Sequence, residues 1–230
     1  MLNQIKKDIE DLENPEKAKL LQRFFKTGPG QYGEGDIFLG ITVPLQRQIA
    51  KKYTNLSLDE IQELLSSKIH EHRLIALLIL IDKYKKADQI KKEEILNLYL
   101  KNTKYINNWD LVDLSAPNIV GDYFLEKDKS ILYKLANSDN LWEKRIAVLA
   151  TFTFIKNNRF DDSLKISEIL LKDKHDLIHK AVGWMLREIG KKDQKTEEDF
   201  LKKHYKNMPR TMLRYSIERF SEEKRKFYLS

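Results

Sequence analysis

Apolar residues recur every three or four positions along most of the chain, which is the spacing of amphipathic helices. This pattern predicts a first helix over 1–12. Asn14 followed by Pro15 is a helix cap followed by proline at the first helical position, so a second helix is expected to run to about Lys26. The residues expected to be buried by this second helix are Ala18, Leu21, Phe24 and Phe25.

Further helix starts follow. Residues 38–43 are expected to be briefly extended, and Pro44 then opens a helix through Tyr53. Ser57 and Glu60 have the spacing of a capping box, which predicts a helix to about Ser66. From His70 onward the pattern predicts helical pairs almost without interruption.

The stretch 107–117 combines a helix start, a helix end and candidate chemistry. Asn108 can cap a helix, and Pro117 is expected to close it. Trp109 and Asp113 are four residues apart and therefore lie on one helix face. An aromatic plane beside a carboxylate suits a cationic guest. The alternative is a half-buried tryptophan and a solvated aspartate.

Comparable apolar helices repeat at intervals of 34–36 residues. Helix pairs at this period predict an all-α solenoid of HEAT-like repeats, built as a single domain over 1–230. Equivalent positions should line a concave groove, and four of the five are basic. A basic groove suits a nucleic-acid backbone or an acidic peptide. The positions heading the repeats are Arg73, Trp109, Arg145, Lys180 and Arg214.

Composition supports a helical protein. The chain has 230 residues, 41% of them apolar, with only eight glycines and five prolines. There is no cysteine, which excludes disulfides and thiol chemistry and fits a reducing cytoplasm. No apolar run reaches the ~18 residues of a membrane span, and the N-terminus lacks the apolar core of a signal peptide.

Positive charge is concentrated near the C-terminus. The net charge is +7, and residues 171–230 hold sixteen Lys and Arg against ten Asp and Glu. A one-sided basic surface is typical of a protein that binds a polyanion. A net charge of this size is equally compatible with ordinary solubility.

A glycine-rich loop over 28–36 interrupts the helical pattern. It is not a P-loop, because no strand precedes it and no Gly-Lys-Ser/Thr follows it. Two interpretations remain: a flexible connector, or a loop that becomes ordered on a nucleic-acid backbone.

The neighbouring residues in the sequence suggest roles for three further groups: Arg145, Trp184 and the pair His175 and His179. Arg145 is either an arginine with a packed stem or a bidentate phosphate clamp. Trp184 follows Gly183 in an apolar helix, so it is either core or part of a site where a backbone or a ligand approaches closely. His175 and His179 lack a third metal ligand, so structural roles are expected for the histidines and no metal site is predicted.

Several motifs occur in a fixed order and together resemble one family. They are Asn14-Pro15-Glu16-Lys17-Ala18, Phe38-Leu39-Gly40-Ile41 with Pro44, Trp109-Asp110-x-x-Asp113, Asp122-x-Phe124-Leu125, Ser138-Asp139-Asn140-x-Trp142-x-x-Arg145-x-Ala147 and Ala181-x-Gly183-Trp184-x-Leu186-Arg187-Glu188. Over nearly its whole length the chain resembles the AlkD-like DNA alkylation repair glycosylases, which are HEAT-like solenoids.

The resemblance implies excision of cationic N-alkylated purines, such as 3-methyladenine and 7-methylguanine, without a metal or cofactor. It implies that Asp113 is the catalytic carboxylate, that Trp109 and Trp184 flank the lesion nucleotide, and that Arg145 holds the DNA backbone. The other residues expected to contact DNA are Arg187, Lys180, Arg47, Arg210 and Arg214.

The sequence thus predicts a cytoplasmic, monomeric DNA glycosylase, associated with the nucleoid when bound, that acts on double-stranded DNA containing alkylated bases. Two alternatives remain: a non-catalytic HEAT-like protein that binds damaged or branched DNA, and a scaffold that binds an acidic peptide.

Overall fold

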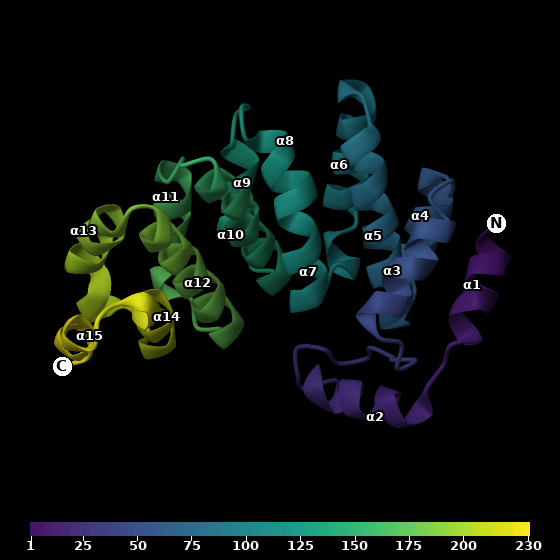
Figure 1. Ribbon diagram of the computed structural model, residues 1–230, viewed down its shortest axis with the longest axis horizontal. Helices are drawn as coiled ribbons and strands as arrows, with labels where there is room; N and C mark the ends of the chain where they lie inside the picture. The colour runs from purple at the N-terminus through teal and green to yellow at the C-terminus, as the bar shows by residue number, and fades with distance from the viewer. The chain divides into compact units, whose positions relative to one another are not determined.

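The computed structural model describes all 230 residues, and its only strand-like feature is an isolated parallel bridge between Ile37 and Ile69. The chain forms two compact units, Met1–Ser115 and Ala116–Ser230, whose helices are labelled in Figure 1. The predicted all-α fold class is therefore confirmed. The HEAT-like solenoid, its concave basic groove and the single domain over 1–230 stay predictions.

Seven α-helices and one short 3-10 helix make up the first unit. They are α1 (Leu2–Glu10), α2 (Pro15–Phe24), α3 (Val43–Lys52), α4 (Leu58–Leu65), α5 (His70–Lys86), α6 (Gln89–Lys101), the 3-10 helix Thr103–Tyr105 and α7 (Trp109–Ala116).

The second unit begins with a π-helix and continues through α8 to α15, with 3-10 turns between some of them. Its elements are the π-helix Pro117–Gly121, α8 (Asp122–Phe124), α9 (Ser130–Ala136), α10 (Leu141–Lys156), α11 (Asp161–Ile169) with the turn Leu170–Lys172, α12 (Asp176–Lys192), α13 (Gln194–His204) with Tyr205–Asn207, α14 (Arg210–Ser216) with Ile217–Arg219, and α15 (Glu222–Leu229). None of the helices in the chain has both the length and the apolar character that a membrane span requires.

Short-range polar contacts start the helices where the sequence predicts. The Asn14 side chain accepts the backbone N–H of Lys17 at 3.0 Å. Ser57 and Glu60 form the predicted capping box at the start of α4. The α2 helix ends at Phe24 instead of Lys26. The expected burial of Phe24 is wrong, because its side chain is 62% exposed while Phe25, rotated by about 100° on the helix, is buried.

The centre of the first unit is one long helix, and that of the second is formed by two, α10 and α12. In the first unit α5 packs against α3, α4 and α6, and most of its residues from His70 to Ile81 are buried. In the second unit α10 packs against α9, α11 and α12, and α12 packs in turn against α13 and α14. Gly183 lets the α14 backbone approach α12, since a Cβ there would lie 2.5 Å from the Met212 carbonyl oxygen.

Pro117 ends the α-helix but does not end the helical path. The α7 helix stops at Ala116, as predicted, yet the chain continues as a π-helix over Pro117–Gly121 and then as α8. Proline has no N–H to donate, and the wider π turn accommodates that loss. The Pro117 carbonyl accepts a hydrogen bond from Thr153 Oγ1 of α10 at 2.6 Å, which ties this segment to the second unit's central helix.

The five positions that head the sequence repeats all lie within the first five residues of a helix, in α5, α7, α10, α12 and α14. They do not all face solvent. Arg73 is 2% exposed and pairs with Asp36 at 2.7 Å, so the expectation of a cation lining a groove is wrong at this position. A neighbouring carboxylate, brought close by the fold, draws the guanidinium inward.

Glu197 of α13 is a buried carboxyl group without a full set of partners. One of its oxygens fills the space beside Gly190 of α12, and Oε1 has no hydrogen-bond partner. Burial, reinforced by the nearby charge of Glu198, raises the pKa of Glu197 to about 8 despite the opposing charge of Arg187. The folded protein therefore holds a proton there that the unfolded chain releases.

We expect Glu197→Gln to stabilise the protein at alkaline pH. A raised folded-state pKa means that wild-type stability is fully present below the unfolded value near 4.5 and falls as the pH rises toward 8. The loss between pH 5 and pH 8 is about 3 kcal/mol. Melting temperatures measured across this range should show the variant close to wild type at pH 5 and several degrees higher at pH 8.

The control is Glu223→Gln, which neutralises an exposed carboxylate of the second unit and should follow wild type at every pH. Parallel wild-type and Glu197→Gln curves would contradict the assignment of a buried proton to Glu197.

Candidate functional site

The start of α7 carries the two residues that the sequence places at a catalytic centre. Asn108 is fully buried, and α7 begins directly after it, as predicted. Its side-chain oxygen accepts the N–H of the adjacent Trp109 at 2.8 Å, and not that of the second or third helical residue, which is the bond of a usual cap. Trp109 and Asp113 are both partly exposed and lie one helical turn apart. The structure thus confirms that they share one face of a helix and leaves both accessible.

Aromatic rings fix the Trp109 indole. The indole stacks on Phe25 with ring centroids 5.2 Å apart and an interplanar angle of 22°. It also meets the edge of Phe24 at 6.0 Å. Phe25 and Phe38 stack in turn at 4.9 Å and belong to the core that α2 covers. One face of the Trp109 indole is therefore covered by Phe25, and the side chain as a whole stays partly exposed.

Asp113 lies close to a buried phenol. Burial in the core, together with the negative charge of Asp113, raises the pKa of Tyr99, which stays a neutral phenol. The Tyr99 hydroxyl is 2.8 Å from the Ser115 hydroxyl, at the end of the same short helix. Asp113 therefore lies one helical turn after Trp109 and near a buried pair of hydroxyl groups.

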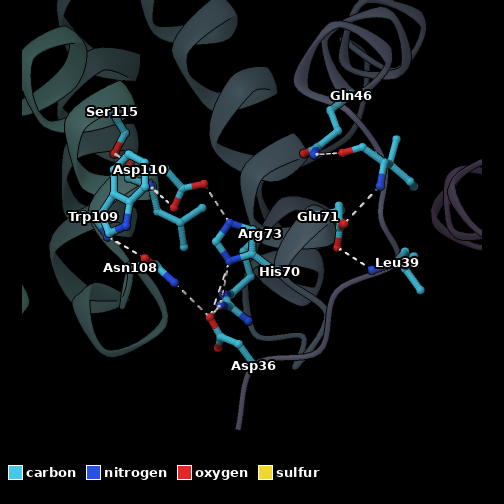
Figure 2. A network of polar contacts seen from close by, with 12 residues as sticks. Asp36, Leu39, Gln46, His70, Glu71, Arg73, Asn108, Trp109, Asp110 and Ser115 are labelled. Carbon is cyan, nitrogen blue, oxygen red and sulfur yellow. Dashed lines mark hydrogen bonds and ion pairs between the residues drawn. The ribbon is translucent and has the colours of Figure 1, made fainter. Parts of the chain in front are cut away.

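A buried group of charged side chains holds the first turn of α7 in place (Figure 2). His70, at the head of α5, has its Nε2 atom 2.8 Å from Asp110 of α7 and its Nδ1 atom 3.4 Å from Asp36. Arg73 pairs with the same Asp36 oxygen at 2.7 Å, and the Asn108 amide approaches it at 3.4 Å. The loop before α3, the head of α5 and the start of α7 thus meet in one cluster.

The pKa values in this cluster move in opposite directions. Burial opposes the charged form of His70, but the carboxylates of Asp110 and Asp36 outweigh it and raise the pKa of the ring. Burial likewise opposes ionisation of Asp36, yet His70 and Arg73 hold the pKa of that carboxyl below its usual value. The cluster therefore favours an imidazolium at His70 and a carboxylate at Asp36.

The next residue of α5 anchors the chain segment that leads into α3. The Glu71 carboxylate accepts three backbone N–H groups, from Leu39 at 3.0 Å, Gly40 at 2.9 Å and Ile41 at 3.2 Å (Figure 2). Gly40 has φ +83° and packs directly on the backbone of Asn14 and Ala18, where a Cβ would clash. Glu71 thereby fixes α2 and its aromatic residues over α5.

A cavity of about 290 Å³ opens beside this cluster. Its walls are mainly apolar and come from α2, the segment before α3 and α5, and His70 and Asp110 lie on its polar side. The residues around it include Leu20, Phe24, Phe38, Val43, His70 and Asp110.

Trp184 lies in the second unit, on α12. Its ring is partly exposed and packs at 5.7 Å from Phe152 of α10, and its indole N–H donates to Glu188 at 3.1 Å. Arg187 pairs with Glu218 and lies near Glu188, with 17% of its side chain exposed. Trp184 is thus neither fully core nor free in solvent.

The expected DNA-binding cations differ in how far the fold leaves them available. Arg145 is 5% exposed, and its Nη1 donates to the Leu177 carbonyl at 2.6 Å. Lys180 pairs with Asp176 at 2.7 Å. Three others are exposed, and one of these, Arg210, also donates to the Leu229 carbonyl. The exposed residues are Arg47, Arg210 and Arg214.

His175 and His179, the pair considered as metal ligands, both contact backbone groups of the protein. The Nδ1 atom of His175 accepts the backbone N–H of Leu177, and Nε2 of His179 is 2.6 Å from the Asp173 carbonyl. No three His, Asp or Glu side chains are arranged to hold a metal ion, and this includes the Asp36, His70 and Asp110 cluster.

Sequence analysis does not predict that Asp36, His70 and Asp110 meet, although Asp110 belongs to the Trp109-Asp110-x-x-Asp113 motif and a structural role is expected for the histidines. The one local signal is the run from His70 to Arg73, four polar residues at the head of an apolar helix, all of which are buried. Such a run costs free energy unless each residue finds a partner, so it points to a buried polar cluster. The partners themselves lie 34 and 40 residues away from His70.

Comparison with known proteins connects this geometry to one family. Residues 5–220 match the family described as DNA alkylation repair enzyme. A protein of Enterococcus faecalis, described as a predicted DNA alkylation repair enzyme, has a similar fold, with a TM-score of 0.70 and 16% identity over 91% of this chain and 97% of its own. The smu.31 protein of Streptococcus mutans UA159 has a TM-score of 0.54 and 19% identity over 90% and 100%.

No curated protein matches the chain. At these identities the two solved structures support the fold alone, whereas the family match extends over nearly the whole sequence. The chain therefore belongs to the DNA alkylation repair enzyme family.

Proposed function

We propose that the protein is a monofunctional DNA glycosylase that excises cationic N-alkylated purines, such as 3-methyladenine and 7-methylguanine, from duplex DNA. The observation that carries the proposal is that Trp109 and Asp113 lie on one face of α7 and are both partly exposed, in a member of this family. An indole face attracts positive charge, and a carboxylate one turn away neutralises it.

In the proposed reaction the bond between C1′ of the deoxyribose and the purine nitrogen breaks. Its electron pair leaves with the base, which is already cationic and departs as a neutral purine. The sugar is left as an oxocarbenium-like cation, and the Asp113 carboxylate is the group that stabilises it. A water oriented by the same carboxylate then adds to C1′ and loses its proton. No metal or cofactor is needed in this sequence of steps.

Further residues complete the proposal. Trp184 is proposed to flank the lesion nucleotide, as Trp109 is, and Arg145 to hold the DNA backbone. The remaining proposed phosphate contacts are Arg187, Lys180, Arg47, Arg210 and Arg214. Contacts of this kind position a duplex without reading its sequence, so selectivity would come from how easily the base leaves.

We expect Asp113→Asn to reduce the rate of base release by about 10²–10³-fold, the usual loss when one preorganised electrostatic group is removed. The measurement is single-turnover release of 7-methylguanine from methylated duplex DNA. The matched control, Asp59→Asn, neutralises an exposed carboxylate of the same unit and should leave the rate unchanged.

Equal rates for wild type and Asp113→Asn would remove Asp113 from the mechanism. If wild type binds DNA but releases no base, the non-catalytic binder of damaged or branched DNA becomes the better explanation.

DNA affinity should fall steeply with salt if several phosphates are neutralised. Six such contacts correspond to a loss of about 10³-fold between 50 and 200 mM salt. We expect Arg214→Ala, which truncates an exposed side chain, to weaken binding alike for all sequences and to reduce the salt slope by about 1. Fluorescence anisotropy of labelled duplexes measures both quantities.

Lys85→Ala removes an exposed lysine that is not among the proposed contacts and serves as the control. An affinity that hardly responds to salt would argue against a DNA groove and for the acidic-peptide alternative.

A further inference from the structure

The His70 ring joins three elements at the point where α7 begins. It is 2% exposed and lies between Asp36, which ends the glycine-rich loop, and Asp110, in the first turn of α7. Both contacts involve a carboxylate oxygen, and an ionised carboxylate can only accept a hydrogen bond. A neutral imidazole has one N–H and can satisfy one of them, whereas an imidazolium satisfies both.

Charge balance favours the imidazolium. The groups that face the ring are Asp36 from the loop, Asp110 from α7 and Arg73 from its own helix, with Arg73 Nη2 3.5 Å from Nδ1. Lys17 of α2 lines the same cavity. Among the groups in direct contact, two carboxylates, one guanidinium and one imidazolium sum to zero, so the charged ring balances the ion pairs of the cluster.

The same ring also packs against the aromatic residues that hold Trp109. His70 stacks on Phe38 with centroids 4.4 Å apart and lies 5.2 Å from Phe25, on which the Trp109 indole is stacked. His70 therefore fixes the first turn of α7 through Asp110 and the indole through Phe25.

The α7 helix is short, so the position of its first turn determines the orientation of the entire helix. It has eight residues, and Asp113 follows Asp110 by less than one turn. A small rotation at Asp110 therefore displaces the Asp113 carboxylate, and a misplacement of about 1 Å can cost 10²-fold in rate.

We propose that His70 is a positioning residue for the site: it bridges Asp36 and Asp110, anchors the first turn of α7 and so sets the placement of Trp109 and Asp113. The inference rests on the proposed function for its kinetic consequence, while its structural consequence stands apart from catalysis.

The experiment pairs His70→Phe with Asp110→Asn in a double-mutant cycle. Phenylalanine keeps a ring on Phe38 but removes both nitrogen contacts, and Asp110→Asn weakens the same contact from the other side. Each variant should lower the rate constant of 7-methylguanine release about tenfold or more, with little change in DNA affinity. Because His70 acts through Asp110, the double variant should lose no more than the worse single variant.

The matched control is His72→Gln. His72 is on the same helix and is equally buried, but it contacts the Ser67 hydroxyl at 3.0 Å and not α7. The rate of 7-methylguanine release by His72→Gln should stay close to that of wild type. Melting temperatures of all variants separate displacement of α7 from unfolding, and Asp110→Asn keeps the test valid if His70→Phe does not fold.

A second readout is independent of activity. Protein labelled with 5-fluorotryptophan gives one ¹⁹F signal for each of its three tryptophans, assigned by single Trp→Phe variants. His70→Phe and Asp110→Asn should shift the Trp109 signal and leave Trp184 unchanged. If this shift occurs but wild type releases no base, the positioning role stands and the glycosylase proposal fails. An unmoved Trp109 signal, or additive rate losses in the cycle, would overturn the positioning role.

Discussion

The contact between His70 and Asp110 is the constraint on which the geometry of the first unit depends. It joins the central helix α5 to α7 at 2.8 Å, and Asp36 and Arg73 complete the same buried cluster. Burying four ionisable groups is costly, and an apolar cluster of similar volume could be at least as stable. A charged cluster is selective, however, because each member requires a particular partner. Its contribution is therefore to specify one arrangement of the loop, α5 and α7.

The two units use charge in different ways. In the first, positive and negative groups from distant parts of the chain are paired inside around His70, and the Glu71 carboxylate is bound by backbone N–H groups. The second unit carries most of the chain's excess positive charge, and its residues Arg210 and Arg214 remain at the surface. The interior of the second unit holds Glu197, a carboxyl that favours its protonated form. Internal pairing gives precise placement, while exposed cations give long-range attraction for a polyanion.

This division fits the proposed chemistry. A cationic alkylpurine needs little help to leave, so the enzyme has to supply a correctly placed negative charge and a grip on the DNA backbone. Trp109 and Asp113 are held at the start of a short helix by an aromatic stack and a polar cluster. Such support is what an electrostatic mechanism requires, because a carboxylate that must reorient during the reaction stabilises the transition state less.

The sequence by itself determined the helical class, the helix starts at Asn14, Ser57 and Asn108, and the shared face of Trp109 and Asp113. These features depend on helical periodicity and on hydrogen bonds that span four residues or fewer. Only the tertiary structure decided that Arg73 turns inward, that Phe24 stays exposed and that His70 lies between two carboxylates. The contacts of Arg73 and His70 depend on partners 34 to 40 residues away, and the exposure of Phe24 depends on how α2 packs. No local pattern encodes either.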